Sequence, residues 1–246
     1  MIAGAFGSVT IRHFKVHTGA LLREGLGMGP AETREFITFA SARLRHGGEA
    51  GFDKISSFLR MTGLRDRWNT ALGLSRSEAL AEWIAPHVKG SLLDLLCGSG
   101  GVGRALQQRG VNTTLTEHGK FSSQAAAFDT VLICTNLHHE EDSEALLSLG
   151  ARLARRRLIL IENCIEKDFP GAYQLLIDLF FNRCLNPNDL GSPGTHRTAA
   201  DWIRSASVYG DLVRVEQRRD IPGIPLGHHL IVLDIDGGHQ APGRSP

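Results

Sequence analysis

The fold is decided by Leu92-Leu-Asp-Leu-Leu-Cys-Gly-Ser-Gly-Gly-Val-Gly103, where an apolar run meets a cluster of glycines and a helical pattern follows. Gly98 and Gly100 let a ligand approach the backbone, because glycine adopts turn conformations that other residues avoid. The helix behind them presents free N–H groups and the positive end of its dipole. We therefore expect a ligand site at this strand-to-helix turn.

Short β-rich runs alternate with helical patterns from about residue 91 onward, which is typical of βαβ units around a parallel sheet. The expected parallel strands span 91–97, 111–117, 129–135 and 157–163, and the helices between them span 102–109 and 143–154. Further helices are expected over 171–185 and from Thr198 to about 207. The last two strands, 211–219 and 227–235, have too short a connection for a crossover, so the sheet should end with a reversed strand.

Residues 1–75 show no strand alternation, and helical patterns cover 31–45, 52–61 and, beyond that segment, 77–88. We expect a helical cap over 1–75, a Rossmann-like domain over 76–236 and a frayed tail over 237–246. The cap helices could also form a homodimer.

The composition excludes several classes of protein. With 246 residues, 42% of them hydrophobic, the chain should form a globular core. A net charge of +1 gives no field that would attract nucleic acid or an anionic membrane, and no apolar run reaches the length of a membrane helix. We expect a cytoplasmic protein. The four cysteines lie in apolar runs without paired spacing, so we expect neither disulfides nor a metal site.

Two cofactors compete for the glycine turn. Gly98, Gly100 and Gly103 satisfy G-x-G-x-x-G, the dinucleotide pattern, and Glu117 closes a second strand where ribose hydroxyls would be bound. A nicotinamide-binding strand, however, normally has apolar residues leading into its first glycine. Asp94, four places before Gly98, departs from that pattern.

The segment from Leu92 to Gly100 resembles the first motif of the class I S-adenosylmethionine-dependent methyltransferases, an acid followed by alternating glycines. Phe128 to His139 is similar to the fourth strand of that family, and the reversed last strand is a hallmark of its fold. The resemblance covers roughly residues 77–236. It implies S-adenosylmethionine as the cofactor, held by Asp94, Cys97, Gly98, Ser99, Gly100, Glu117, His118 and Asn136.

The chain departs from the family at two places. Leu96 occupies the position of the usual first motif glycine. Only residues 118–128 separate the second expected strand from the next, which is barely the length of a minimal crossover. We therefore expect the third strand to be missing or shortened, with the adenine pocket open or completed by other residues such as His118.

The candidate chemistry lies at two strand ends. His138 and His139 end one strand, and either could take a proton near neutral pH, although both could instead order the loop and cap the next helix. We favour His139 as the base. Glu162 and Asn163 end the next strand and are expected to contact the methyl acceptor.

His196 and Arg197 follow a loop rich in proline, glycine and asparagine, residues 186–194. Arg197 could bind an acidic acceptor, but it could equally hold the helix that starts at Thr198. The N-terminal helices and residues 187–198 are expected to form the acceptor pocket.

The function expected from these features is methyl transfer from S-adenosylmethionine to an oxygen or nitrogen of a small molecule. Two alternatives remain open: an NAD(P)-dependent oxidoreductase that uses the same glycine turn, and a methyltransferase-like subunit that has lost catalysis and binds a partner through residues 1–75.

Overall fold

A computed structural model describes residues 6–46, 48–116, 126–185 and 195–235 of the chain. These residues form two compact units. The helical unit contains residues 6–76, 166–185 and 220–226. The sheet unit contains 77–116, 126–165, 195–219 and 227–235.

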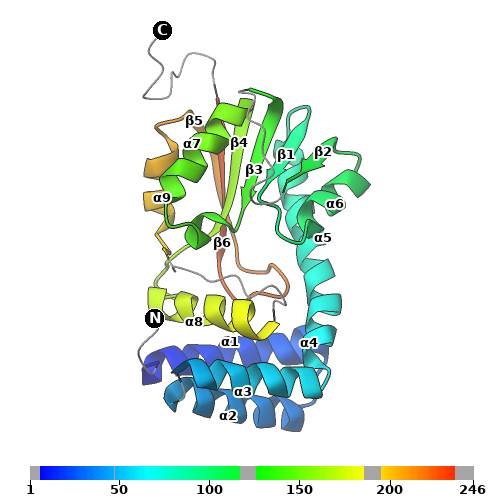
Figure 1. Ribbon diagram of the computed structural model, residues 1–246, viewed down its shortest axis with the longest axis vertical. Helices are drawn as coiled ribbons and strands as arrows, with labels where there is room; N and C mark the ends of the chain where they lie inside the picture. The colour runs from blue at the N-terminus through cyan, green and yellow to red at the C-terminus, as the bar shows by residue number, and fades with distance from the viewer. Residues whose placement is uncertain (1–5, 47, 117–125, 186–194, 236–246) are drawn as a thin grey trace. The chain divides into compact units, whose positions relative to one another are not determined.

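The helical unit consists of helices that lie against one another (Figure 1). They share an apolar core rich in aromatic side chains. Phe14 of one helix, Phe36 of the next and Trp68 of a π-helical turn all pack into this core with Phe180. The helices are α1 (Ser8–Leu26), α2 (Pro30–His46), α3 (Gly48–Met61), α4 (Leu64–Arg67) and α8 (Gly171–Phe180), with π-helical turns at Trp68–Leu72 and Phe181–Leu185.

The helical unit differs from the expected cap in two ways. It contains α1, which the sequence patterns did not indicate; the helix starts at Gly7 without a side-chain cap, and its buried face includes two threonines and a glycine. It also includes α8, which lies within the span 76–236 expected for the Rossmann-like domain. Tyr173 and Ile177 of α8 are buried in the same apolar cluster as Ile11 and Phe14 of α1.

The sheet unit is built on one six-stranded sheet with the order β2-β1-β3-β4-β6-β5. The first four strands are parallel, and β6 runs antiparallel to both of its neighbours. The strands are β1 (Leu92–Leu95), β2 (Thr113–Leu115), β3 (Phe128–Cys134), β4 (Ala154–Asn163), β5 (Asp211–Arg218) and β6 (His228–Asp234). This confirms the predicted Rossmann-like sheet with a reversed last strand, the arrangement of the class I methyltransferase fold.

The third strand of that fold would lie beyond β2. In the described part of the chain β2 is the edge strand, with no further strand beside it. Most of the segment that could supply one, residues 117–125, lies outside the described residues.

Helices lie on both faces of the sheet. Leu93 and Leu95 of β1 point into an apolar cluster with α7 (Ser143–Leu153) and α9 (Ala199–Ala206), which contributes the fully buried Trp202. Asp94 lies between these leucines and so points to the opposite face, where a Cβ on Gly103 of α6 (Gly101–Gln108) would meet it. Trp83 of α5 (Gly73–Ile84) bonds to β5 on that face. Among the described residues, no helix is both long and apolar enough to cross a membrane.

The strand order reverses at β1, since β2 pairs on one side of it and β3 on the other. In open α/β sheets, ligands bind outside the carboxyl ends of the strands at such a point. Leu96 after β1 and Thr135 after β3 both have a positive φ, 59° and 55°. Such backbone is strained for residues other than glycine and clusters at functional sites.

Candidate functional site: the carboxyl ends of β1, β3 and β4

The turn after β1 is formed by alternating left-handed residues. Leu96, Gly98 and Gly100 have φ values of 59°, 54° and 70°. The N–H of Gly100 donates to the carbonyl of Cys97 at 2.8 Å, and Gly100 is the N-cap of α6. The chain therefore reverses within a few residues and leaves the N-terminus of α6 at the edge of the sheet.

The glycines of this turn have different surroundings. A Cβ on Gly103 would lie 2.7 Å from the Asp94 carboxylate and closer still to Leu115, so this glycine lets α6 pack on the sheet. A Cβ on Gly98 would meet no atom of the described residues within 4 Å. The backbone of Gly98 thus faces open space that a ligand can enter.

A hollow of about 290 Å³ lies beside the turn. Arg104 is the charged residue among those that line it, and its guanidinium donates to the carbonyl of Ser99. The lining residues are Cys97, Gly98, Ser99, Gly100, Arg104, Leu115 and Thr116. Four of the predicted cofactor-binding residues therefore share one hollow.

Asp94 lies beneath the turn and is 1% exposed. Burial raises the pKa of its carboxyl group to about 7, although a hydrogen bond from the Gly103 backbone acts in the opposite direction. Its Oδ1 has no hydrogen-bond partner among the described residues. A buried acid with an unused oxygen, next to a hollow, fits a site for a cationic ligand group.

Asn136 connects the ends of β1 and β3. Its Nδ2 donates to the carbonyl of Leu96 at 2.7 Å, so its side chain holds the strained residue that begins the glycine turn. Glu117 and His118, the predicted ribose and adenine contacts, lie outside the described residues.

A buried contact between a histidine and a glutamate lies at the end of β3. Nδ1 of His138 lies 2.6 Å from Oε2 of Glu162, and Oε1 of Glu162 accepts from the N–H of Leu137 at 2.8 Å. His138 is 2% exposed and Glu162 is fully buried. Because a carboxylate only accepts, Nδ1 of His138 donates the proton in this contact.

Glu162 has a different task from the one its sequence position indicated. Both of its oxygens bind the turn after β3, so it positions that turn and not an acceptor. Asn163 is 4% exposed, and its Oδ1 has no hydrogen-bond partner among the described residues.

His139 ends the short 3₁₀ turn Leu137–His139 and, unlike His138, is partly exposed. Its ring centroid lies 4.1 Å from that of His138, which stacks on its other neighbour, His196, at 4.8 Å. Thr195 fixes the turn by donating twice to the carbonyl of His138, from its N–H and its hydroxyl group. The structure thus gathers three predicted histidines at one place.

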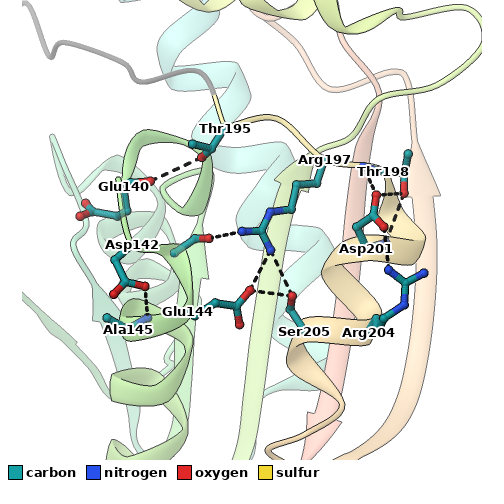
Figure 2. A network of polar contacts seen from close by, with 11 residues as sticks. Glu140, Asp142, Glu144, Ala145, Thr195, Arg197, Thr198, Asp201, Arg204 and Ser205 are labelled. Atoms are coloured by element: carbon teal, nitrogen blue, oxygen red, sulfur yellow. Dashed lines mark hydrogen bonds and ion pairs between the residues drawn. The ribbon is translucent and has the colours of Figure 1, made fainter.

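The side chain of Arg197 points toward Glu144 and Ser205 (Figure 2). Its Nη1 donates to Glu144 at 2.8 Å and to Ser205 at 3.1 Å, and its Nη2 donates to Ser143 at 2.9 Å. The guanidinium also lies over the ring of Trp202, 4.6 Å from the centroid. Of the two roles expected for Arg197, the structural one is observed, because its guanidinium links α7 to α9.

Thr198 is the N-cap of α9, as the sequence predicted. Its side chain accepts from the N–H of Asp201, whose carboxylate bonds back to the cap, so the two form a capping box. This box and the Arg197 network fix the segment that carries His196 (Figure 2).

Sequence patterns did not identify Arg104 or Thr116 as parts of the site. Arg104 is one turn into α6, where a lysine or arginine is ordinary, and Thr116 is an ordinary strand-end residue. Position at the carboxyl end of a strand was the available signal for Thr116. Nothing in the pattern distinguished Arg104.

No family model matches the sequence, and no curated protein matches it. Solved structures do share its chain path. A geranyl diphosphate methyltransferase in complex with SAM has 12% identity and a TM-score of 0.48, with 70% of this chain and 90% of that one covered. TnmH has 15% identity and a TM-score of 0.46, covering 94% and 96%.

A SAM-dependent methyltransferase from Methanosarcina mazei has 12% identity and a TM-score of 0.44, covering 63% of this chain and 97% of its own. Because these identities and TM-scores are low, the likenesses assign no substrate and no reaction to this chain.

Proposed function

We propose that the protein is an S-adenosylmethionine-dependent methyltransferase that acts on an oxygen or nitrogen of a small molecule. The observation that supports this most is the turn after β1. It combines an open face at Gly98, a hollow of about 290 Å³ and the buried Asp94, all at the point where the strand order reverses.

The residues of the turn fit the charges of this cofactor. S-adenosylmethionine carries an ammonium and a sulfonium group, which suit the Asp94 carboxylate, and a carboxylate, which suits Arg104 and the N-terminus of α6. Glu117 would accept hydrogen bonds from the ribose hydroxyls and His118 would help with adenine. When bound, the cofactor supplies an electrophilic methyl group.

The acceptor must lose a proton as its oxygen or nitrogen gains the methyl group. His139 would take that proton, because it is the partly exposed histidine of the pair. His138 and Glu162 would hold the turn that carries it. Asn163 and His196 would contact the acceptor. Arg197 is left out of the site, since its guanidinium ties α7 to α9.

The two alternative functions make different predictions for this turn. An NAD(P)-dependent oxidoreductase would bind a nicotinamide dinucleotide there in preference to S-adenosylmethionine. A subunit without catalysis would bind S-adenosylmethionine, or nothing, and transfer no methyl group to any acceptor.

Calorimetric titration with S-adenosylmethionine, S-adenosylhomocysteine, NAD and NADP tests the assignment. In the Gly98→Ala variant, the new Cβ enters the open face of the turn, so affinity for S-adenosylhomocysteine should fall by about 10-fold or more, comparable to a loss of 1.4 kcal/mol. Gly110→Ala is the matched control. Gly110 also has a positive φ, 81°, and a Cβ there would meet no atom within 4 Å in the described part of the chain. Gly110 does not line the hollow.

Both variants should lose a similar, small amount of stability, about 1 kcal/mol, because both force alanine into left-handed backbone. Equal affinity in the two variants, or tighter binding of NAD than of S-adenosylhomocysteine, would contradict the assignment.

A further inference from the structure

The strand at the sheet edge, β5, is unusually exposed for a strand that carries apolar residues. Leu212, Val213 and Val215 are 45%, 49% and 40% exposed. β5 pairs with β6 on one side, and no strand of the described residues pairs with its other side. An exposed edge strand of this kind is a template for another strand.

The alternation of hydrogen-bonded pairs along the sheet shows which residues of β5 direct their backbone N–H and C=O groups outward. The N–H of Ile235 donates to the carbonyl of Arg156, directly opposite in the β4–β6 register, so this is a hydrogen-bonded pair. Such pairs alternate along an antiparallel ladder. Leu233 and Ile231 therefore bond to β4, whereas Val232 and Leu230 turn their N–H and C=O groups to β5.

Val232 lies opposite Arg214 and Leu230 lies opposite Glu216. The backbone groups of Arg214 and Glu216 are thus used by β6. Val215, between them, directs its N–H and C=O away from the sheet, where a further strand could bond to them.

We propose that β5 pairs antiparallel with β5 of a second copy of this chain, with Val215 opposite Val215 on the twofold axis. This register brings the outward backbone groups of the two valines into one hydrogen-bonded pair, about 5.5 Å between Cα atoms. It also sets Arg214 of each copy opposite Glu216 of the other. The strand is therefore complementary to itself in charge as well as in hydrogen bonding.

Glu216 is already positioned for this pairing. Its Oε2 accepts from Nε1 of Trp83 at 2.8 Å, and its Oε1 accepts from Nε of Arg214 at 2.6 Å. The bonds from Trp83 and Arg214 lower the pKa of Glu216, so it is charged at neutral pH. The two copies would form a cluster of two arginines and two glutamates. Each arginine would have one glutamate beside it on its own strand and another opposite it on the second copy.

The pairing closes on itself. A twofold contact uses the same patch on both copies and occupies the outer edge of both β5 strands, so this contact forms dimers and not filaments. A bulge between Leu212 and Arg214 shifts the register at the start of β5, which limits flat pairing to the part of the strand around Val215.

Analytical ultracentrifugation of the full chain at about 1 to 100 µM tests the proposal. Dissociation constants in this range are typical of contacts of modest size. Wild-type protein should show a monomer–dimer equilibrium. Val215→Lys places two ammonium groups opposite each other and should raise the dissociation constant by about 100-fold or more. Val9→Lys is the matched control, because Val9 is an exposed valine of α1, at 61%, and it should leave the equilibrium unchanged.

The register has its own test. Arg214→Glu sets like charges opposite each other and should weaken the dimer to a similar extent, whereas Arg214→Glu combined with Glu216→Arg restores opposite charges and should restore most of the affinity. Thermal melts confirm that each variant is folded.

A wild-type chain that is monomeric at 100 µM, or a dimer that Val215→Lys leaves intact, overturns the proposal. A dimer that is lost in Val9→Lys and kept in Val215→Lys also overturns it and assigns dimerisation to the N-terminal helices.

Discussion

The ends of β1 and β3 are neighbours in the sheet, and each begins its turn with a strained, left-handed residue, Leu96 or Thr135. Beyond that point they differ. The turn after β1 is made of glycines and presents main-chain groups to a hollow. The turn after β3 is filled by side chains, with His138 buried against Glu162.

On the proposed function, this difference would separate cofactor binding at the β1 turn from proton transfer at the β3 turn. Main-chain N–H groups and a helix N-terminus suit a cofactor whose shape is fixed, and they need no titrating side chain. Removal of a proton needs a side chain on a fixed turn, and the bonds of Glu162 to His138 and to the N–H of Leu137 hold the turn that carries His139. On the proposed function, cofactor affinity and the rate of methyl transfer are separate measurements, so each turn can be tested by its own readout.

The largest effect is expected from Glu162→Ala at the β3 turn. The substitution leaves His138 and the N–H of Leu137 buried without their partner, so the free energy of unfolding should fall by about 3–5 kcal/mol. Denaturant titration measures this loss. Glu141→Ala, an exposed acid near the same turn, should change stability by about 0.5 kcal/mol or less.

A loss below about 1 kcal/mol for Glu162→Ala, typical of an exposed pair, would mean that the buried pair does not hold the turn. The contrast between the two strand ends would then disappear.

The second effect concerns catalysis. His139→Ala should lower the rate of methyl transfer by about 100-fold, a typical general-base contribution, and leave the affinity for S-adenosylhomocysteine unchanged. Formation of S-adenosylhomocysteine is measured with an acceptor found by screening small phenols and amines. His46→Ala, at an exposed histidine of α2, is the control and should keep the wild-type rate.

A near-normal rate for His139→Ala would show that alignment alone drives the transfer. It would remove the base from the proposal and leave cofactor binding at the β1 turn in place.

The contrast between the two turns also marks what sequence could predict. Alternating strands and helices, the short last connection and the glycine cluster predicted the sheet, its reversed strand and the position of the β1 turn. A glycine cluster in a sequence indicates a turn with positive φ, because few other residues adopt that backbone conformation. Leu96 adopts the same backbone without that signal, so its strain was not visible.

The β3 turn was less predictable. Glu162 was expected at the correct edge of the sheet, but whether its side chain meets an acceptor or a neighbouring histidine depends on packing between strands far apart in sequence. The same limit applies to Arg197, whose partners in α7 lie more than 50 positions away.

The third effect is a pH dependence from Asp94 beneath the β1 turn. Its folded pKa, about 7, lies above its unfolded value near 3.8, so between these values the folded chain holds a proton that the unfolded chain releases. Stability from this group is therefore greatest below about pH 4 and falls as pH rises toward 7. The loss from pH 5 to pH 7 should be about 2 kcal/mol.

Asp94→Asn, which stays neutral, should remove this slope, whereas Asp53→Asn on the exposed surface of α3 should keep it. Denaturant titrations at the two pH values give the comparison. Parallel pH profiles for wild type and Asp94→Asn would show that the buried acid is ionised throughout.

The smallest effect tests the strain at the start of the β1 turn. At an ordinary loop position, a protein with glycine is less stable than one with alanine by about 0.4–1 kcal/mol, because glycine raises the conformational entropy of the unfolded chain. At Leu96, where φ is 59°, alanine keeps the strain and glycine relieves it. Both variants lose the same partly buried leucine side chain, so the packing loss cancels between them. Leu96→Gly should therefore be more stable than Leu96→Ala by about 1 kcal/mol, as measured by denaturant titration of both variants side by side. If Leu96→Ala is the more stable, Leu96 does not hold left-handed backbone in solution, and the glycine turn begins at Gly98 without a strained residue before it.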